Sequence, residues 1–107
     1  MGALLRYQDA YRAMDIRAVR RIHPSLGREA GQRLQRQFRN CKAFDVAFGQ
    51  PSPAIGEDPD QATVSARTTY TCIPRTGQPP LSMTSSDIFQ LRKLAGDWII
   101  ERAGALD

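Results

Sequence analysis

The segment from Leu81 to Ala103 constrains the fold more than any other part of the sequence. It contains two runs with β-strand alternation, joined by a tight turn. Phe89 and Leu91 alternate in the first run, and Trp98 and Ile100 alternate in the second. A period of two is what a strand needs when only one of its faces is buried. We therefore predict a hairpin with one apolar face that the rest of the chain covers.

The turn of this hairpin is predicted at residues 95–97, where the sequence reads Ala-Gly-Asp. Gly96 adopts the positive φ that a short hairpin turn requires, and Asp97 tolerates that conformation nearly as well.

Three helices are predicted before any strand. Residues 3–14 carry apolar side chains at helical spacing, and Asp15 is a suitable N-cap for a second helix over 16–22. Pro24 ends that helix, because a residue before proline is pushed out of the α region. Ser25 then caps a third helix, whose apolar residues recur in steps of four from Leu26 to Phe38.

After Cys41 the apolar period changes from that of a helix to that of a strand. One strand is predicted over 44–49. The prolines that follow it, at 51 and 53, mark an edge, a bend or a bulge. A longer strand is predicted over 62–73, with its hydroxyl-rich face toward solvent.

The two cysteines, Cys41 and Cys72, are predicted to be free and buried. If the strands on either side of Pro59 pair in a simple register, Cys72 lies opposite Val46, five residues from Cys41. Five strand residues span about 17 Å, whereas the Cα atoms of a disulfide lie within about 7 Å of each other. A bulge at the prolines would change this register by a residue or two.

These elements predict one α+β domain over residues 1–107, with three N-terminal helices packed on a curved antiparallel sheet of about four strands. The tight ends favour a domain taken from a longer protein. No apolar run approaches the roughly 20 residues that cross a bilayer, and the first residues lack the layout of a signal peptide. We expect a soluble domain, either cytoplasmic or extracytoplasmic, whose compartment the sequence leaves open.

The positive charge is concentrated in the predicted helices. Residues 1–40 hold nine arginines and three acidic residues, while the whole chain has a net charge of +4. Such a layer could attract an anionic polymer. No aromatic or glycine-rich nucleic-acid motif accompanies the arginines, so solvated helix faces are the preferred interpretation and nucleic acid is not expected to bind.

The whole pattern resembles the nuclear transport factor 2-like superfamily, the cone-shaped fold of ketosteroid isomerases and SnoaL-like cyclases. The resemblance rests on RYQDAYRAMD in the first helix, QFRNCKAF at the end of the third, and a last hairpin reading F-x-L-x-K-x-x-G-x-W-I-I. It is similar in particular to small domains attached to bacterial serine/threonine kinases and other multidomain proteins. It implies a pocket at the open end of the cone and a dimer through the sheet.

The predicted pocket is lined by residues of the first helix and of several strands: Tyr7, Tyr11, Phe44, Tyr70, Asp87 and Trp98. Isomerases of this superfamily use a tyrosine and two carboxyl groups in a dry cavity. Asp87 shares strand parity with Phe89 and could project inward, where it would need a partner or a ligand; a bulge could instead turn it outward. A second inward carboxylate is missing.

The preferred hypothesis is a non-catalytic sensory or interaction module that binds a small apolar molecule or another protein domain, with no cofactor and no metal. A homodimer through the sheet, or contact with other domains of a parent chain, is expected. One alternative is a small isomerase, cyclase or dehydratase that uses Asp87 and Tyr11. The other is a basic surface that binds anionic polymers.

Overall fold

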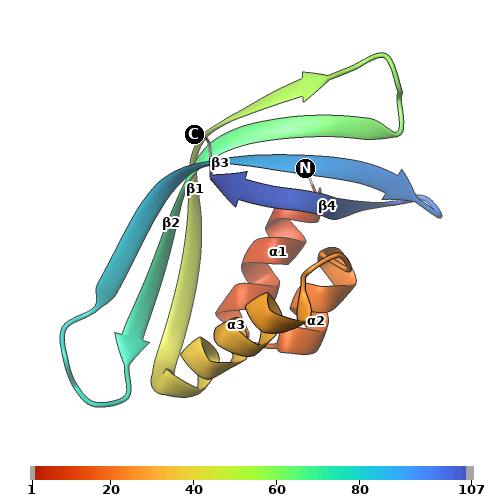
Figure 1. The fold of residues 1–107 in the computed structure, drawn as a ribbon. Coiled ribbons are helices and arrows are strands. Elements are labelled where there is room, and N and C mark those ends of the chain that lie inside the picture. The colour runs from red at the N-terminus through yellow and green to blue at the C-terminus, as the bar shows by residue number, and fades with distance from the viewer. Residues whose placement is uncertain (1, 106–107) are drawn as a thin grey trace.

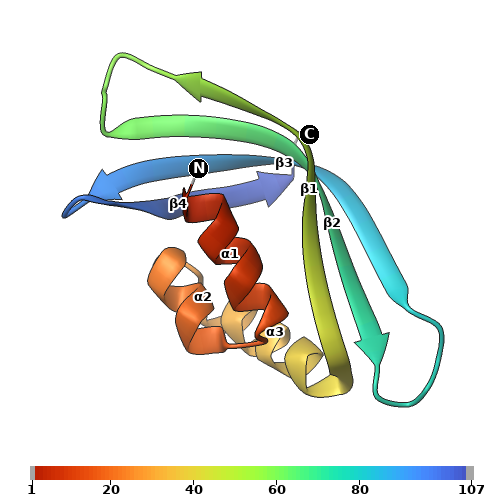
Figure 2. The same cartoon turned by 180° about the vertical axis from the view of Figure 1, so that it is seen from behind.

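The computed structural model describes residues 2–105, in which three helices precede a four-stranded antiparallel sheet. The elements are α1 (Gly2–Arg12), α2 (Ile16–Ile22), α3 (Arg28–Asn40), β1 (Cys41–Ile55), β2 (Gln61–Pro74), β3 (Leu81–Leu94) and β4 (Asp97–Ala105). The strands follow one another across the sheet in chain order. The sheet is strongly bent, and the helices lie inside its concave side (Figures 1 and 2). The predicted α+β architecture is confirmed.

The helix boundaries follow local capping chemistry. Asp15 is the N-cap of α2, where its carboxylate accepts hydrogen bonds from the backbone N–H groups of Arg17 and Ala18 at 3.0 and 3.3 Å. The prediction that Ser25 caps the third helix is wrong. Gly27 is the N-cap of α3, and the Ser25 hydroxyl instead donates to the backbone carbonyl of Glu101 in β4. This hydrogen bond connects the segment that precedes α3 to strand β4.

The final hairpin forms as predicted, with a different distribution of positive φ in its turn. The residues with positive φ are Ala95 (51°) and Gly96 (87°), whereas Asp97 is the first residue of β4. Two consecutive residues with positive φ are typical of the two-residue hairpin turn whose twist matches that of the strands. The turn is therefore one residue shorter than expected.

The core lies between the concave face of the sheet and the helices. Phe89, Leu91 and Ile100 are fully buried, as the alternation predicts, and Trp98 is half-buried against them. The inward face of β2 carries Val64, Ala66, Thr68, Tyr70 and Cys72, and the first three of these are buried.

The two cysteines form a disulfide, which corrects the prediction that they are free. The Cα atoms of Cys41 and Cys72 are 5.6 Å apart. Ser52 pairs with Ser65, one residue away from the expected register, and the bulge between Gly49 and Ser52 adds a second residue of shift, so Cys72 lies opposite Phe44 instead of Val46. A further irregularity follows Cys41, where β1 leaves α3. The sequence signals a bulge at the prolines, but it does not show that several register shifts add up in the same direction.

Within residues 2–105, no helix combines the length and the apolar composition that crossing a bilayer requires.

Candidate functional site

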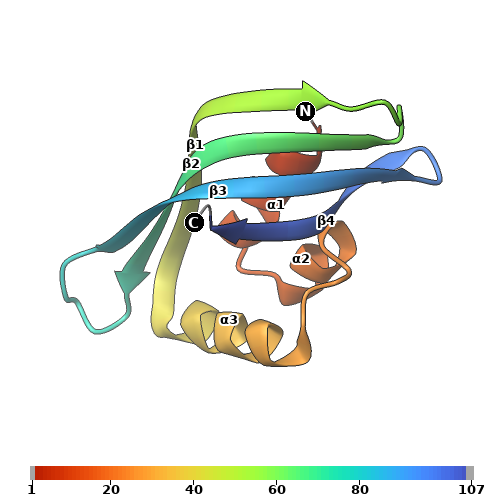
Figure 3. The same cartoon turned by 45° about the horizontal axis from the view of Figure 1, so that its top comes forward.

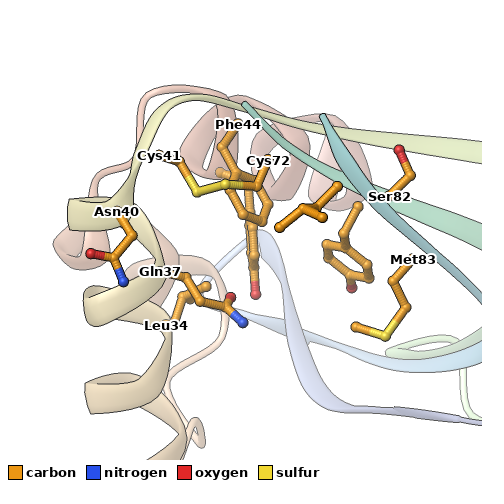
Figure 4. A pocket seen from close by; sticks show the side chains of 11 residues that line it. Leu34, Gln37, Asn40, Cys41, Phe44, Cys72, Ser82 and Met83 are labelled. Carbon is orange, nitrogen blue, oxygen red and sulfur yellow. A yellow bond between two sulfur atoms is a disulfide. The ribbon is translucent and has the colours of Figure 1, made fainter. Parts of the chain in front are cut away.

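A pocket of about 450 Å³ opens between α3 and the concave side of the sheet. Figure 4 shows side chains from the helix and from several strands converging around it, with the disulfide at one wall. The lining residues come from two helices and three strands and are mainly apolar: Tyr11, Leu34, Gln37, Asn40, Cys41, Phe44, Tyr70, Cys72, Leu81, Ser82 and Met83. Pockets of this size accept small ligands.

One wall of the pocket is backed by three tyrosines in hydrogen-bond contact. The hydroxyl of Tyr7 donates to the hydroxyl of Tyr11 at 3.2 Å, and the hydroxyls of Tyr7 and Tyr70 are 2.9 Å apart. A tyrosine hydroxyl carries only one hydrogen. Because that of Tyr7 goes to Tyr11, Tyr70 must donate to Tyr7. The hydrogen of Tyr11 then has no acceptor among the described residues, and Tyr11 is one of the residues that line the pocket.

The tyrosine rings are held in place by aromatic contacts on both sides. The ring centroids of Tyr7 and Tyr11 are 4.5 Å apart, and Tyr7 meets Phe89 edge-on at 5.6 Å. Tyr11 packs against Phe44 at 5.9 Å and against Tyr70 at 5.8 Å. Contacts at these distances favour fixed ring orientations, so the hydroxyl group of Tyr11 is presented in a defined direction.

Burial raises the pKa of all three tyrosines, because the charged phenolate loses its hydration. For Tyr7, repulsion from ionised Tyr11 and Tyr70 raises the pKa further. For Tyr70, burial is the largest cause, and the charges of Tyr11 and Asp87 raise the pKa further. The hydroxyls are therefore neutral hydrogen-bond donors at physiological pH.

These shifts predict a loss of stability in alkali. Above about pH 10 the tyrosines ionise in the unfolded chain, while burial keeps them protonated in the folded one. The unfolding temperature should therefore fall as the pH rises from about 9 to 11. Tyr7→Phe keeps the buried ring but cannot ionise, so its unfolding temperature should fall less over the same range. Equal slopes for the variant and the wild type in a thermal scan would contradict this account.

Asp87 faces inward, as its strand parity predicts, and it has a partner. Asp87 is 7% exposed, and its carboxylate accepts a hydrogen bond from the Ser85 hydroxyl at 2.8 Å. It lies near enough to Tyr70 to raise the pKa of that hydroxyl. The hydrogen-bond partner that an inward Asp87 requires is therefore Ser85, two residues earlier in β3. Within residues 2–105, no second carboxylate is hydrogen-bonded to Asp87.

The structure brings together three of the six residues predicted to line a pocket: Tyr11, Phe44 and Tyr70. Tyr7 lies behind them and contacts both other tyrosines. Asp87 and Trp98 are not among the lining residues. The indole of Trp98 packs against the core, and its backbone carbonyl accepts a hydrogen bond from Arg6.

Sequence reasoning missed the contribution of α3 and of the start of β3. Leu34, Gln37 and Asn40 line the pocket from α3, and Leu81 and Met83 line it from β3. The apolar stripe of α3 predicts that Leu34 is buried, but nothing in the sequence distinguishes a helix that fills the cone from one that leaves a gap beside it.

A second hollow, of about 610 Å³, lies between α1, α2 and the β3–β4 turn. Its lining includes four charged residues of both signs: Arg6, Asp9, Arg21 and Asp97. It lacks the aromatic walls of the first pocket and contains none of the predicted site residues, so it is the weaker candidate.

The arginines of α3 lie on its solvent side. Arg28, Arg33, Arg36 and Arg39 are exposed, whereas Leu34 and Phe38 are buried. The two ion pairs among the described residues are Arg12 with Asp45 and Arg92 with Glu101, so neither involves an arginine of α3. Over the same residues, no three histidine, cysteine, aspartate or glutamate side chains gather in a way that could hold a metal ion.

No protein-family model and no curated protein matches the chain. Solved structures do match the chain. A proposed scytalone dehydratase from Novosphingobium aromaticivorans has a TM-score of 0.80 and 10% identity, covering 95% of this chain and 76% of that one. A proposed calcium/calmodulin-dependent protein kinase II association domain from Xanthomonas campestris has a TM-score of 0.78 and 14% identity, covering 98% and 84%. A proposed dehydratase of the NTF2-like family from Streptomyces avermitilis has a TM-score of 0.72 and 12% identity, covering 98% and 91%.

A bent antiparallel sheet around three helices, with a pocket at one side, defines this chain as an α+β cone. The fold is that of the nuclear transport factor 2-like superfamily, as the sequence pattern predicts. At these identities the comparison establishes the fold alone. The similar structures are named for dehydration in two cases and for kinase association in another, so the fold does not decide the activity.

Proposed function

We propose that this chain is a non-catalytic binding module whose pocket takes a small, largely apolar molecule with one hydrogen-bond acceptor. The observation that carries the proposal is the composition of the pocket between α3 and the sheet. Its walls are aromatic rings, aliphatic side chains and a disulfide, and the described lining contains neither a carboxylate nor an imidazole.

The apolar walls supply the affinity in this proposal. Phe44, Tyr70 and Leu34 present carbon surface, and burying a ligand against such surface contributes about 25 cal/mol per Å² before the costs of association. A cavity of about 450 Å³ has room for a ligand of one or two rings or a short alkyl chain.

The polar groups supply the orientation. The Tyr11 hydroxyl has an unused hydrogen on the wall, and Gln37 and Asn40 provide amide groups from α3. A carbonyl or hydroxyl oxygen on the ligand could accept from Tyr11 while its apolar part fills the cavity. This arrangement is typical of a binding site, in which few polar groups fix the pose of an apolar ligand.

Catalysis of the isomerase kind is the second candidate, and one observation favours it: Asp87 is buried and close to Tyr70. Against it, Asp87 does not line the pocket and its described hydrogen-bond donor is Ser85. A general base must reach the proton that it removes. The binding interpretation therefore explains more of the lining than the enzymatic one.

We propose a sensory or assembly role for the module within a larger protein. One protein of similar fold is named as a kinase association domain, which is a role of this type. Contact with another copy or with a neighbouring domain would then transmit the occupancy of the pocket.

A pocket-blocking variant tests the proposal. Gln37 is an exposed lining residue, so Gln37→Trp should obstruct the cavity without disturbing the core. The neutral fluorophore N-phenyl-1-naphthylamine should bind the wild type with enhanced emission, and Gln37→Trp should weaken this binding by about tenfold or more, or roughly 1.4 kcal/mol.

Gln35→Trp is the matched control, because Gln35 is equally an exposed glutamine of α3 but does not line the pocket. It should bind the fluorophore like the wild type. Absence of binding to the wild type, or equal loss in both variants, would contradict the proposed site.

A further inference from the structure

The Cys41–Cys72 disulfide forms part of the wall of the pocket between α3 and the sheet. Both cysteines line the cavity, and Figure 4 shows the bond between their sulfur atoms beside it. Cys41 directly follows Asn40, the last residue of α3, whereas Cys72 belongs to β2. The bond therefore connects the end of the helix on one side of the pocket to the sheet on the other side.

Apart from this bond, α3 has few attachments to the sheet beyond the strand that follows it. Its main contacts are with β1 and α2, and Figure 3 shows α3 continuing directly into β1. The pairing of β1 with β2 is irregular between Cys41 and Ala43, where the helix joins the sheet. After β2, the backbone N–H of Arg75 donates to the carbonyl of Asn40 at 3.0 Å, and its Nε donates to the carbonyl of Arg39 at 2.8 Å. The disulfide thus adds a covalent link to a junction that is otherwise held by a few hydrogen bonds.

We propose that the oxidation state of Cys41 and Cys72 controls the affinity of the pocket for its ligand. This inference rests on the proposed function, because it assigns a form of regulation to the same pocket. With the disulfide formed, the end of α3 is fixed against β2 and the pocket binds its ligand. With the disulfide reduced, the end of α3 moves relative to β2 and the pocket binds weakly. Such a module holds its ligand in an oxidising compartment and releases it in a reducing one.

Reduction removes the covalent limit on the separation of the two walls. Cys72 is partly exposed, whereas Cys41 is only 1% exposed, so a thiolate of a dithiol reductant attacks the sulfur of Cys72. A bond forms between the reductant and Cys72, and Cys41 leaves as a thiolate that takes up a proton. The second thiolate of the reductant then displaces Cys72, which takes up a proton in turn. The protein gains two electrons and two protons, and the reductant becomes a cyclic disulfide.

The ligand loses affinity because it must then order the helix itself. Gln37 and Asn40 line the pocket from α3, whereas Tyr11, Phe44 and Tyr70 line it from α1, β1 and β2. Contact with both sets requires a fixed distance between the helix and the sheet. A disulfide that fixes a binding surface in advance increases affinity by reducing the entropy lost on binding. Reduction transfers that entropic cost to the binding step.

The rest of the core is expected to stay folded when the bond is reduced. Phe89, Leu91 and Ile100 are fully buried on β3 and β4, which carry neither cysteine. Leu34 and Phe38 bury the inner side of α3. Burial of these apolar side chains does not depend on a covalent bond at the helix end. The effect of reduction should therefore be confined to one wall of the pocket.

A fluorophore titration of the oxidised and the reduced chain tests the inference. N-phenyl-1-naphthylamine should bind the oxidised wild type, and a dithiol reductant should raise its dissociation constant by about tenfold. Far- and near-ultraviolet circular dichroism of the same samples should stay close to that of the oxidised chain, since a merely unfolded or molten chain would lose one or both signals. Weaker binding that is accompanied by loss of these signals would be a result of unfolding and would overturn the inference.

The double variant Cys41→Ser/Cys72→Ser is the matched control, because it has no disulfide to reduce. It should bind the fluorophore as weakly as the reduced wild type, and the reductant should not change its affinity. Equal or tighter binding by the reduced wild type, or a response of the double variant to the reductant, overturns the inference and leaves the proposed function intact. Absence of binding to both forms of the wild type contradicts the proposed function and the inference together.

Discussion

Reduction of the Cys41–Cys72 disulfide is expected to lower the free energy of unfolding by about 3–4 kcal/mol. The bond closes a loop with a sequence separation of 31 residues, and in the chain-entropy model a loop of this size stabilises the fold by that amount through its effect on the unfolded state. Marginal domains have only about 5–15 kcal/mol in total. The measurement is urea unfolding with and without a dithiol reductant that leaves other groups unchanged.

The double variant Cys41→Ser/Cys72→Ser is the control for this prediction. It should be destabilised by an amount similar to that of the reduced wild type, and reductant should have no further effect on it. An unchanged unfolding midpoint for the wild type on reduction would show that the bond is not formed in solution. The disulfide also joins the end of α3 to β2 at the pocket wall, so its loss should loosen the wall as well as the fold.

The architecture was accessible from the sequence because each element carries its own periodic signal. Phe89 and Leu91 alternate on a strand, Asp15 caps a helix, and Gly96 marks a turn, and each of these is a local property of a few neighbouring residues. A tertiary contact changes where α3 begins. Ser25 and Gly27 could both begin a helix, and the hydrogen bond of Ser25 to β4 decides between them.

The pairing of the cysteines was not accessible in this way, because register is a sum of local shifts. A single bulge would leave Cys41 and Cys72 too far apart. The register at the hairpin end, the bulge at Gly49 and the irregularity after Cys41 together bring their Cα atoms to 5.6 Å. Each shift depends on how β1 packs against β2 and α3, which no pattern within either strand encodes.

The candidate site was predicted only in part for a related reason. Strand parity identifies which residues face inward, and Phe44, Tyr70 and Asp87 do so. It does not show how deeply a helix fills the space in front of them. Gln37 on α3 and Met83 on β3 line the pocket because of the distance between helix and sheet, which is set by packing of the whole core.

Phe89→Ala is expected to cost about 3–5 kcal/mol of unfolding free energy, because it truncates the largest of the fully buried side chains. The ring of Phe89 meets Tyr7 at 5.6 Å and Phe48 at 5.6 Å, both edge-on. Alanine would leave a cavity at the centre of the cone and remove the support of Tyr7, so both transfer energy and packing are lost.

Leu94→Ala is the matched control, because Leu94 is an apolar residue of the same strand that is 56% exposed. Its effect should stay within about 0.5 kcal/mol, as for most surface substitutions. Equilibrium unfolding in urea measures both variants against the wild type, with a common slope as the check on two-state behaviour. If Phe89→Ala lowered the free energy of unfolding by less than Leu94→Ala, the face of β3 assigned to the core would be wrong. The assignment of Leu81, Met83 and Asp87 to the same face would then be wrong as well. Because parity is shared along the strand, this single comparison tests the core and the pocket rim together.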